Sequence, residues 1–197
     1  MKHRSPSDTL LKSLVWTQDF AEECDSGVVA VDKGRLSVML GLLYICWQNT
    51  ESVREEWTYQ LMFGDKESWW LGFELTGVPY TFEAHYAPIV GSTVRTTDDA
   101  NEICAFTIAH VDEAGRLLWY NGSLLRNKAL NLTEFDIPTH WMIDGTWWKG
   151  SVRSEMSCMS GGLLRMLAEE ETRVLTESVR VAMTVDQRLV NGGFFAS

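Results

Sequence analysis

The chain has 197 residues, of which 45% are hydrophobic and 22% are charged, so we expect one domain, residues 1–197, with a closed core. Seventeen Lys and Arg residues against 27 Asp and Glu residues give a net charge of −10. This charge argues against nucleic acid and against anionic membrane surfaces as partners. The longest apolar run, residues 38–47, is too short for membrane insertion, and the N-terminus shows no secretion signal. We therefore expect a cytoplasmic protein.

The sequence contains four cysteines, Cys24, Cys46, Cys104 and Cys158. Their spacing does not match a metal-binding pattern. In a reducing cytosol they should be free, buried thiols. The triplets Asn121-Gly122-Ser123 and Asn131-Leu132-Thr133 match the glycosylation sequon, which has no meaning without secretion.

A helix is predicted at the start of the chain. Ser7 can cap it, Asp8 lies in its first turn, and Gly27 ends it. Apolar residues recur between these points at helical spacing, namely Leu10, Leu11, Leu14, Val15 and Phe20.

Alternating patterns and tight turns then predict mostly strands. Residues 32–35 form a turn between strands at 28–31 and 36–47, and residues 112–115 form one between 103–111 and 116–120. The other predicted strands are 57–63, 69–75, 80–86, 127–135, 146–156, 172–185 and 189–195. Residues 161–170 are predicted as a short helix. About 8–10 antiparallel strands after one helix favour a closed β-barrel, with an α+β cone around a curved sheet as the alternative.

Tryptophan is the most unusual component, with nine residues. Such rings either fill a core or line a pocket for an apolar ligand. In the adjacent pairs at 69–70 and 147–148, one ring of each pair must face away from the other if both segments are strands. We take Trp57, Trp70 and Trp147 as the candidate ligand-binding residues.

Candidate catalytic residues are polar groups on the predicted strands. Glu74 shares a face with Trp70, and Arg153 shares one with Trp147, although a solvated face has the same pattern. His85 lies two residues from Glu83, so the two form either an acid–base pair or part of an exposed face. Tyr120 is the fourth candidate.

Motif searches predict neither a cofactor nor a metal. The sequence lacks a Gly-x-Ser-x-Gly elbow, a glycine-rich nucleotide loop and zinc-type spacing.

One helix followed by consecutive hairpins with Trp-rich strands resembles the calycin superfamily of lipocalin-like barrels. Its Gly-x-Trp mark occurs here only late, at Gly145-Thr146-Trp147. Residues 177–183 through 192–197 are similar to the end of phycobiliprotein lyases, which are calycins that handle bilins. The resemblance implies an antiparallel lipocalin-like barrel that binds an apolar molecule.

The leading hypothesis is a cofactor-independent cyclase, isomerase or lyase, acting on a hydrophobic or conjugated small molecule inside a Trp-rich lumen. A non-catalytic carrier or chromophore chaperone is the second hypothesis. The third is an α+β cone dehydratase or cyclase with a His85–Glu83 pair. The expected partner is a hydrophobic small molecule, and a homodimer is a further possibility.

Overall fold

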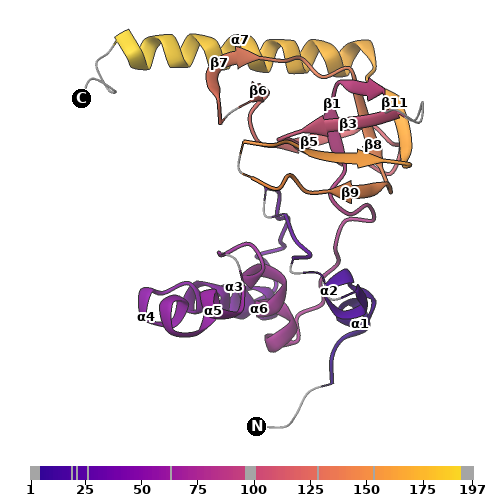
Figure 1. Ribbon diagram of the computed structural model, residues 1–197. Coiled ribbons are helices and arrows are strands. Elements are labelled where there is room, and N and C mark those ends of the chain that lie inside the picture. Colours follow the sequence, from indigo (N-terminus) through magenta and orange to yellow (C-terminus); the bar gives the residue numbers. More distant parts are fainter. Residues whose placement is uncertain are drawn as a thin grey trace. The chain divides into compact units, whose positions relative to one another are not determined.

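The computed structural model describes residues 5–18, 20, 22–25, 27–62, 64–95, 101–127, 129–152 and 154–191. By its internal contacts the chain divides into two compact units (Figure 1), unit 1 at Met1–Ala84 and unit 2 at His85–Ser197.

Unit 1 is helical in its described residues. Its elements are α1 (Asp8–Lys12), α2 (Leu14–Gln18), α3 (Leu36–Gln48), α4 (Glu51–Val53), the π-helix η1 (Arg54–Thr58), α5 (Tyr59–Leu61) and α6 (Ser68–Thr76). The predicted N-cap is confirmed, because Ser7 Oγ accepts a hydrogen bond from Leu10 N at 3.1 Å. The predicted single helix up to Gly27 is wrong, since α1 ends at Lys12 and α2 ends at Gln18. The strands predicted at 36–47, 57–63 and 69–75 are wrong, since all three segments are helical. Short apolar runs do not distinguish a buried helix from a buried strand.

Close contact between α3 and α6 forms the core of unit 1. Two glycines permit it: a Cβ at Gly41 would lie 2.7 Å from the Phe73 ring, and one at Gly72 would lie 2.2 Å from Ile45 Cγ1. Ile45 and Phe73 are themselves core residues, together with Val38 and Val78. The missing side chains at the two glycines therefore bring the helix axes near enough for the core to close.

Unit 2 holds eleven described strands in three antiparallel sheets. Sheet A has the order β11 (Leu163–Met166), β8 (His140–Ile143), β1 (Ile89–Gly91), β4 (Ile108–Val111) and β5 (Leu117–Asn121). Sheet B has the order β2 (Thr93–Arg95), β3 (Asn101–Ala105), β10 (Ser157–Ser160) and β9 (Thr146–Trp148). The third sheet pairs β6 (Leu125–Asn127) with β7 (Asn131–Phe135).

These sheets do not close on themselves, so the predicted lipocalin-like barrel is wrong. The prediction failed because three of the segments counted as strands are helices of unit 1, and because the strands of unit 2 are divided among three open sheets. The predicted turn at 112–115 is confirmed: Gly115 N donates to Asp112 O at 2.8 Å and joins β4 to β5.

Sheet A has a different neighbour on each face. Ile89 and Met142 are paired across β1 and β8 and pack with Ile103 and Met159 of sheet B. The alternate residues Val90 and Trp141 face the other way and pack against the final helix, α7 (Glu169–Asn191), through Leu175 and Val179. Unit 2 is therefore layered as α7, sheet A and sheet B. Figure 1 shows α7 continuing past the sheet.

Near the C-terminus, the predicted strand is a helix in the structure, and part of the predicted helix is a strand. Residues 172–185, predicted as a strand, lie in α7, and residues 163–166, predicted as helical, form β11. The acidic run at 169–171 begins α7 instead of ending a helix, and its negative charge there stabilises the helix dipole. Glu171 Oε2 accepts a hydrogen bond from Ala168 N at 2.6 Å, as in a capping box. Among the described residues, no helix is long and apolar enough to cross a bilayer.

Candidate functional site

The buried carboxylate of Glu67 begins the polar face of α6. Glu67 is only 2% exposed. Glu67 Oε1 accepts from Cys24 N at 2.9 Å, and Oε2 accepts from Glu23 N at 3.1 Å and from Trp70 Nε1 at 2.6 Å. A carboxylate in this position is tolerated because N–H donors replace the water that it loses.

A second carboxylate, Glu74, lies two turns further along the same face. It accepts from Ser7 N at 2.8 Å, from Ser7 Oγ at 2.6 Å and from Tyr80 Oη at 2.9 Å. Burial raises the pKa of Tyr80 well above its usual range; the hydrogen bond with Ser7 lowers it, and the neighbouring Glu74 raises it further. The Tyr80 hydroxyl therefore stays neutral and donates a hydrogen bond to Glu74.

We call this group, Glu23, Glu67, Trp70, Glu74 and Tyr80, the α6 cluster. Burial raises the pKa of Glu23, and the negative charge of Glu67 adds to it, while backbone N–H groups of residues 14 and 15 oppose it. Burial also raises the pKa of the Cys24 thiol to about 12, which makes that thiol unreactive. Trp70 packs on Tyr80 with ring centroids 6.5 Å apart.

Sequence reasoning thus found two members of the α6 cluster, Trp70 and Glu74, and missed the other three. Glu67 lies between the strands predicted at 57–63 and 69–75, and only a helix assignment places it on one face with Trp70, three residues later. The described carboxylates of the cluster are bound by internal donors. The α6 cluster therefore holds the N-terminal segments against α6, which is a positioning role.

A hollow of about 350 Å³ lies elsewhere in unit 1, beside η1. We call it the Trp57 hollow. Its aromatic and polar lining comes from α3, α4 and η1 and includes Tyr44, Trp47, Ser52, Glu56 and Trp57, while α5 and α6 contribute leucines. The candidate ligand-binding residue Trp57 is 68% exposed there. It lies in a π-helix, an irregularity often found at functional sites.

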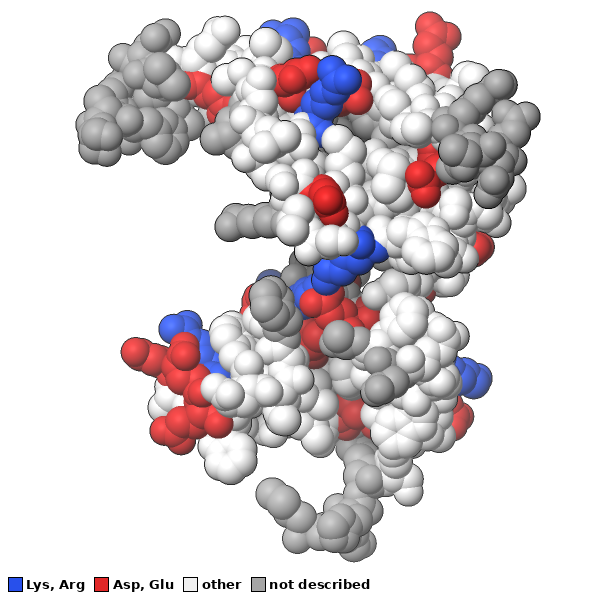
Figure 2. All heavy atoms as spheres, in the orientation of Figure 1, with Lys and Arg blue, Asp and Glu red and all other residues white. Residues whose placement is uncertain are grey.

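Polar groups in the Trp57 hollow remain available, unlike those of the α6 cluster. Among the described residues, nothing accepts from the Trp57 indole N–H and nothing donates to the Glu56 carboxylate. Figure 2 shows acidic side chains gathered at the end of unit 1 where α4 lies in Figure 1, and the acidic residues of that end are Glu51, Glu55 and Glu56. The hollow therefore combines exposed aromatic rings with a negative, hydrogen-bond-accepting edge.

The remaining candidate residues are dispersed through unit 2. His85 Nδ1 lies 2.9 Å from Asp144 Oδ1, and Asp144 has a left-handed backbone with φ of 56°. Tyr120 packs against the core beneath α7. Trp147 packs against the core between the sheets, and its Nε1 donates to Ala87 O at 3.0 Å. Arg153 lies outside the described residues.

A disulfide joins Cys104 of β3 to Cys158 of β10, so the prediction of four free thiols is wrong for these two. Cys24 and Cys46 are free, and Cys46 is exposed, not buried. The two cysteines are direct partners across antiparallel strands, a proximity that only the fold reveals.

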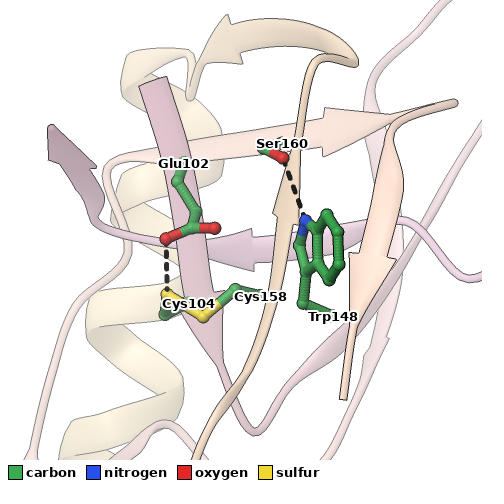
Figure 3. The surroundings of a disulfide bond; sticks show 5 residues. All are labelled: Glu102, Cys104, Trp148, Cys158 and Ser160. Carbon is green, nitrogen blue, oxygen red and sulfur yellow. Dashed lines mark hydrogen bonds between the residues drawn. A yellow bond between two sulfur atoms is a disulfide. The ribbon is translucent and has the colours of Figure 1, made fainter. Parts of the chain in front are cut away.

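Figure 3 shows Glu102 and Trp148 on either side of this disulfide. Glu102 Oε2 lies 3.5 Å from Cys104 Sγ. A disulfide sulfur has no proton to donate, so this contact becomes a hydrogen bond only when the thiol is reduced. Glu102, Cys104 and Cys158 also lie close enough to share a metal ion, but oxidised sulfurs offer no thiolate ligand.

Comparison with known proteins gives a consistent result. Residues 2–112, which include all of unit 1 except Met1, match the family described as "Mannosyltransferase putative". Alpha-1,3-mannosyltransferase MNT3 of Saccharomyces cerevisiae is 35% identical over 119 residues, which are 57% of this chain and 18% of that protein. Alpha-1,3-mannosyltransferase MNN1 of the same yeast is 31% identical over 135 residues, 64% of this chain and 16% of that protein. The chain thus spans less than a fifth of the length of these relatives.

These matches overturn the calycin resemblance and the functions drawn from it. A cyclase, isomerase or lyase, a carrier, and a cone-type dehydratase are all wrong as hypotheses, because the relatives transfer mannosyl groups. The likeness rested on hairpins that the structure replaces with helices. Since the family match covers more than half of the sequence, this chain belongs to that mannosyltransferase family.

Proposed function

We propose that the chain is part of an α-1,3-mannosyltransferase and that the Trp57 hollow contacts a mannose unit of its substrate. The observation that carries the transferase proposal is the family match, which covers residues 2–84 of unit 1. The hollow lies inside the matched segment and has available hydrogen-bonding groups.

The chemistry of a hexose suits the lining of the hollow. A pyranose presents C–H groups on its faces and hydroxyl groups around its edge. The exposed indole of Trp57 offers a flat apolar surface for the C–H face, beside Trp47 and Tyr44. The Glu56 carboxylate accepts hydrogen bonds from sugar hydroxyls, and Ser52 both donates and accepts.

Mannosyl transfer forms a bond between an acceptor hydroxyl oxygen and the anomeric carbon, while the bond to the donor's leaving group breaks. The acceptor hydroxyl loses its proton during this step. In this step the Trp57 hollow binds and orients a sugar.

Isothermal titration calorimetry with methyl α-mannoside tests the binding role. We expect saturable binding that Glu56→Gln weakens roughly tenfold, because a hydrogen bond to a charged group contributes about 1.5 kcal/mol. Trp57→Ala should weaken it at least as much. Trp148→Ala in unit 2 is the matched control, since that ring is 60% exposed but lies outside the hollow.

Equal binding of methyl α-galactoside, or an equal loss in Trp148→Ala, would show that the hollow does not select mannose. Absence of binding would remove the proposed role of the hollow and leave the family membership intact.

A further inference from the structure

We propose that Asn131 is an N-glycosylation site and that the other sequon, at Asn121, is not. This inference does not depend on mannosyl transfer. It begins with the Cys104–Cys158 disulfide, because stable disulfides belong mainly to oxidising compartments. The sequon is modified in the secretory route, so the disulfide supplies the context that the sequence did not.

The structure places the Asn131 sequon in an open position. Asn131 begins β7 directly after the turn from β6, in which Leu130 N donates to Asn127 O at 3.1 Å. Asn131 and Thr133 are both exposed. The hairpin belongs to a separate two-stranded sheet, so a bulky glycan at its tip leaves the layered core of unit 2 undisturbed.

Contacts within this sequon keep its reactive groups together. Asn131 Oδ1 accepts from Thr133 Oγ1 at 2.8 Å and from Thr133 N at 2.9 Å. These bonds use the carbonyl oxygen of the amide and leave Nδ2, the atom that receives the sugar, directed away from them. The hydroxyl that defines the sequon is on the surface beside the acceptor amide.

The Asn121 sequon has its hydroxyl in the opposite environment. Ser123 Oγ is buried and has no hydrogen-bond partner, and Ser123 O accepts from Thr107 Oγ1 at 3.0 Å. Gly122 between them has a left-handed φ of 115°, and a Cβ there would lie 2.9 Å from Phe106 O. In the folded unit, an enzyme cannot reach this hydroxyl.

The modification joins Asn131 Nδ2 to the anomeric carbon of an oligosaccharide diphosphate. The bond from that carbon to the phosphate oxygen breaks, the diphosphate leaves with the electron pair, and the amide gives up one proton. The product is a neutral N-linked amide.

The test is production of the 197-residue chain behind a cleavable secretion leader in a eukaryotic host, followed by peptide N-glycosidase treatment. We expect one glycosidase-sensitive gel shift, and mass spectrometry should find Asn converted to Asp at position 131 only. Asn131→Gln and Thr133→Ala should abolish the shift. Thr133→Ser, which restores the sequon, should retain it.

Ser123→Ala is the matched control and should leave the shift unchanged. Labelling with a maleimide before reduction should modify Cys46 alone in the folded parent and variants, which shows that loss of the glycan is not misfolding, and should modify only Cys24 and Cys46 once denaturant is added. An unshifted parent, a shift that survives Thr133→Ala, or one lost in Ser123→Ala would overturn the proposal. Four reactive thiols would overturn its oxidising premise.

Discussion

At the scale of single residues, Glu67 is the side chain on which the polar organisation of unit 1 depends. Its two oxygens accept three N–H donors from Glu23, Cys24 and Trp70. Removing the carboxylate leaves these donors without an acceptor in a site where water is scarce.

Glu67→Ala should therefore lower the free energy of unfolding of unit 1 by about 2–4 kcal/mol, as measured by urea denaturation. Glu67→Gln keeps one acceptor oxygen and should cost less. Glu56→Ala is the control, and a surface carboxylate without a partner should change stability by less than about 0.5 kcal/mol. Similar losses for Glu67→Ala and Glu56→Ala would refute this role for Glu67.

Glu23 should give the stability of unit 1 a defined pH dependence. Its folded-state pKa is raised, mainly by burial, so the folded state binds a proton more tightly than the unfolded state. The resulting stabilisation is complete below the unfolded pKa and is lost as pH rises through the folded pKa.

Glu23→Gln removes this titration and keeps an oxygen for Val15 N, the donor to Glu23 Oε2. The variant should therefore gain stability relative to the parent as pH rises from about 4 to about 7, measured by thermal unfolding at each pH. A difference between the two proteins that stays constant over this range would contradict the assignment.

Some residue relationships hold in a strand and in a helix alike. A separation of four residues puts two side chains on one face in both, so Trp70 and Glu74 share a face of α6 although the segment was predicted as a strand. Glu67 lies three residues before Trp70, a spacing that unites side chains only in a helix. Its role could not be predicted from a pattern interpreted as strands.

At the scale of elements, the α3–α6 contact depends on the absence of a side chain at Gly72. Alanine usually stabilises a helix relative to glycine. Here an added Cβ would lie 2.2 Å from Ile45 Cγ1, and the overlap should outweigh that gain.

Gly72→Ala should destabilise unit 1 by about 1–3 kcal/mol in chemical denaturation. Ile45→Ala alone should also destabilise it, by leaving a cavity. Combined, the two changes should cost less than the sum of the single effects, because each compensates the volume change of the other. Strict additivity would show that the two side chains do not meet.

The wrongly predicted elements share a physical cause. The sequence of α3 contains no charged residue, so no polar face revealed a helical period. In α7, the β-branched residues between 172 and 185 favour a strand by local propensity. Packing of Leu175 and Val179 on sheet A and the capping contact at Ala168 decide for the helix.

At the scale of the whole molecule, the disulfide should stabilise unit 2 and leave the stability of unit 1 unchanged. Cys104 and Cys158 are 54 residues apart and both belong to unit 2, whereas Cys24 and Cys46 of unit 1 are free. The closed loop restricts the unfolded chain of unit 2 alone.

Reduction, or the pair Cys104→Ser and Cys158→Ser, should lower the stability of unit 2 by about 2–4 kcal/mol by the chain-entropy argument. Unit 1, followed by the amide resonances of α3 and α6, should unfold at an unchanged denaturant concentration. Cys46→Ser is the control and should affect neither transition. An equal shift of both transitions would contradict the separation.

The fold as a whole was predictable only in part. The β4–β5 hairpin has a turn with its own chemical signature, and it was found. The disulfide and the layering of α7 on sheet A unite distant segments, which no local pattern records. Trp57 was named as a candidate ligand-binding residue of a barrel, and its place beside Glu56 in the hollow depends on the helical register that the sequence pattern did not indicate.

The most direct test of the proposed sugar contact is a nuclear magnetic resonance titration that follows the indole N–H signals of the nine tryptophans. With α-1,3-linked mannobiose as ligand, the Trp57 signal should move in a saturable way, while those of Trp70 and Trp148 stay in place. Unchanged indole signals, or equal movement of all of them, would contradict a mannose contact in this hollow.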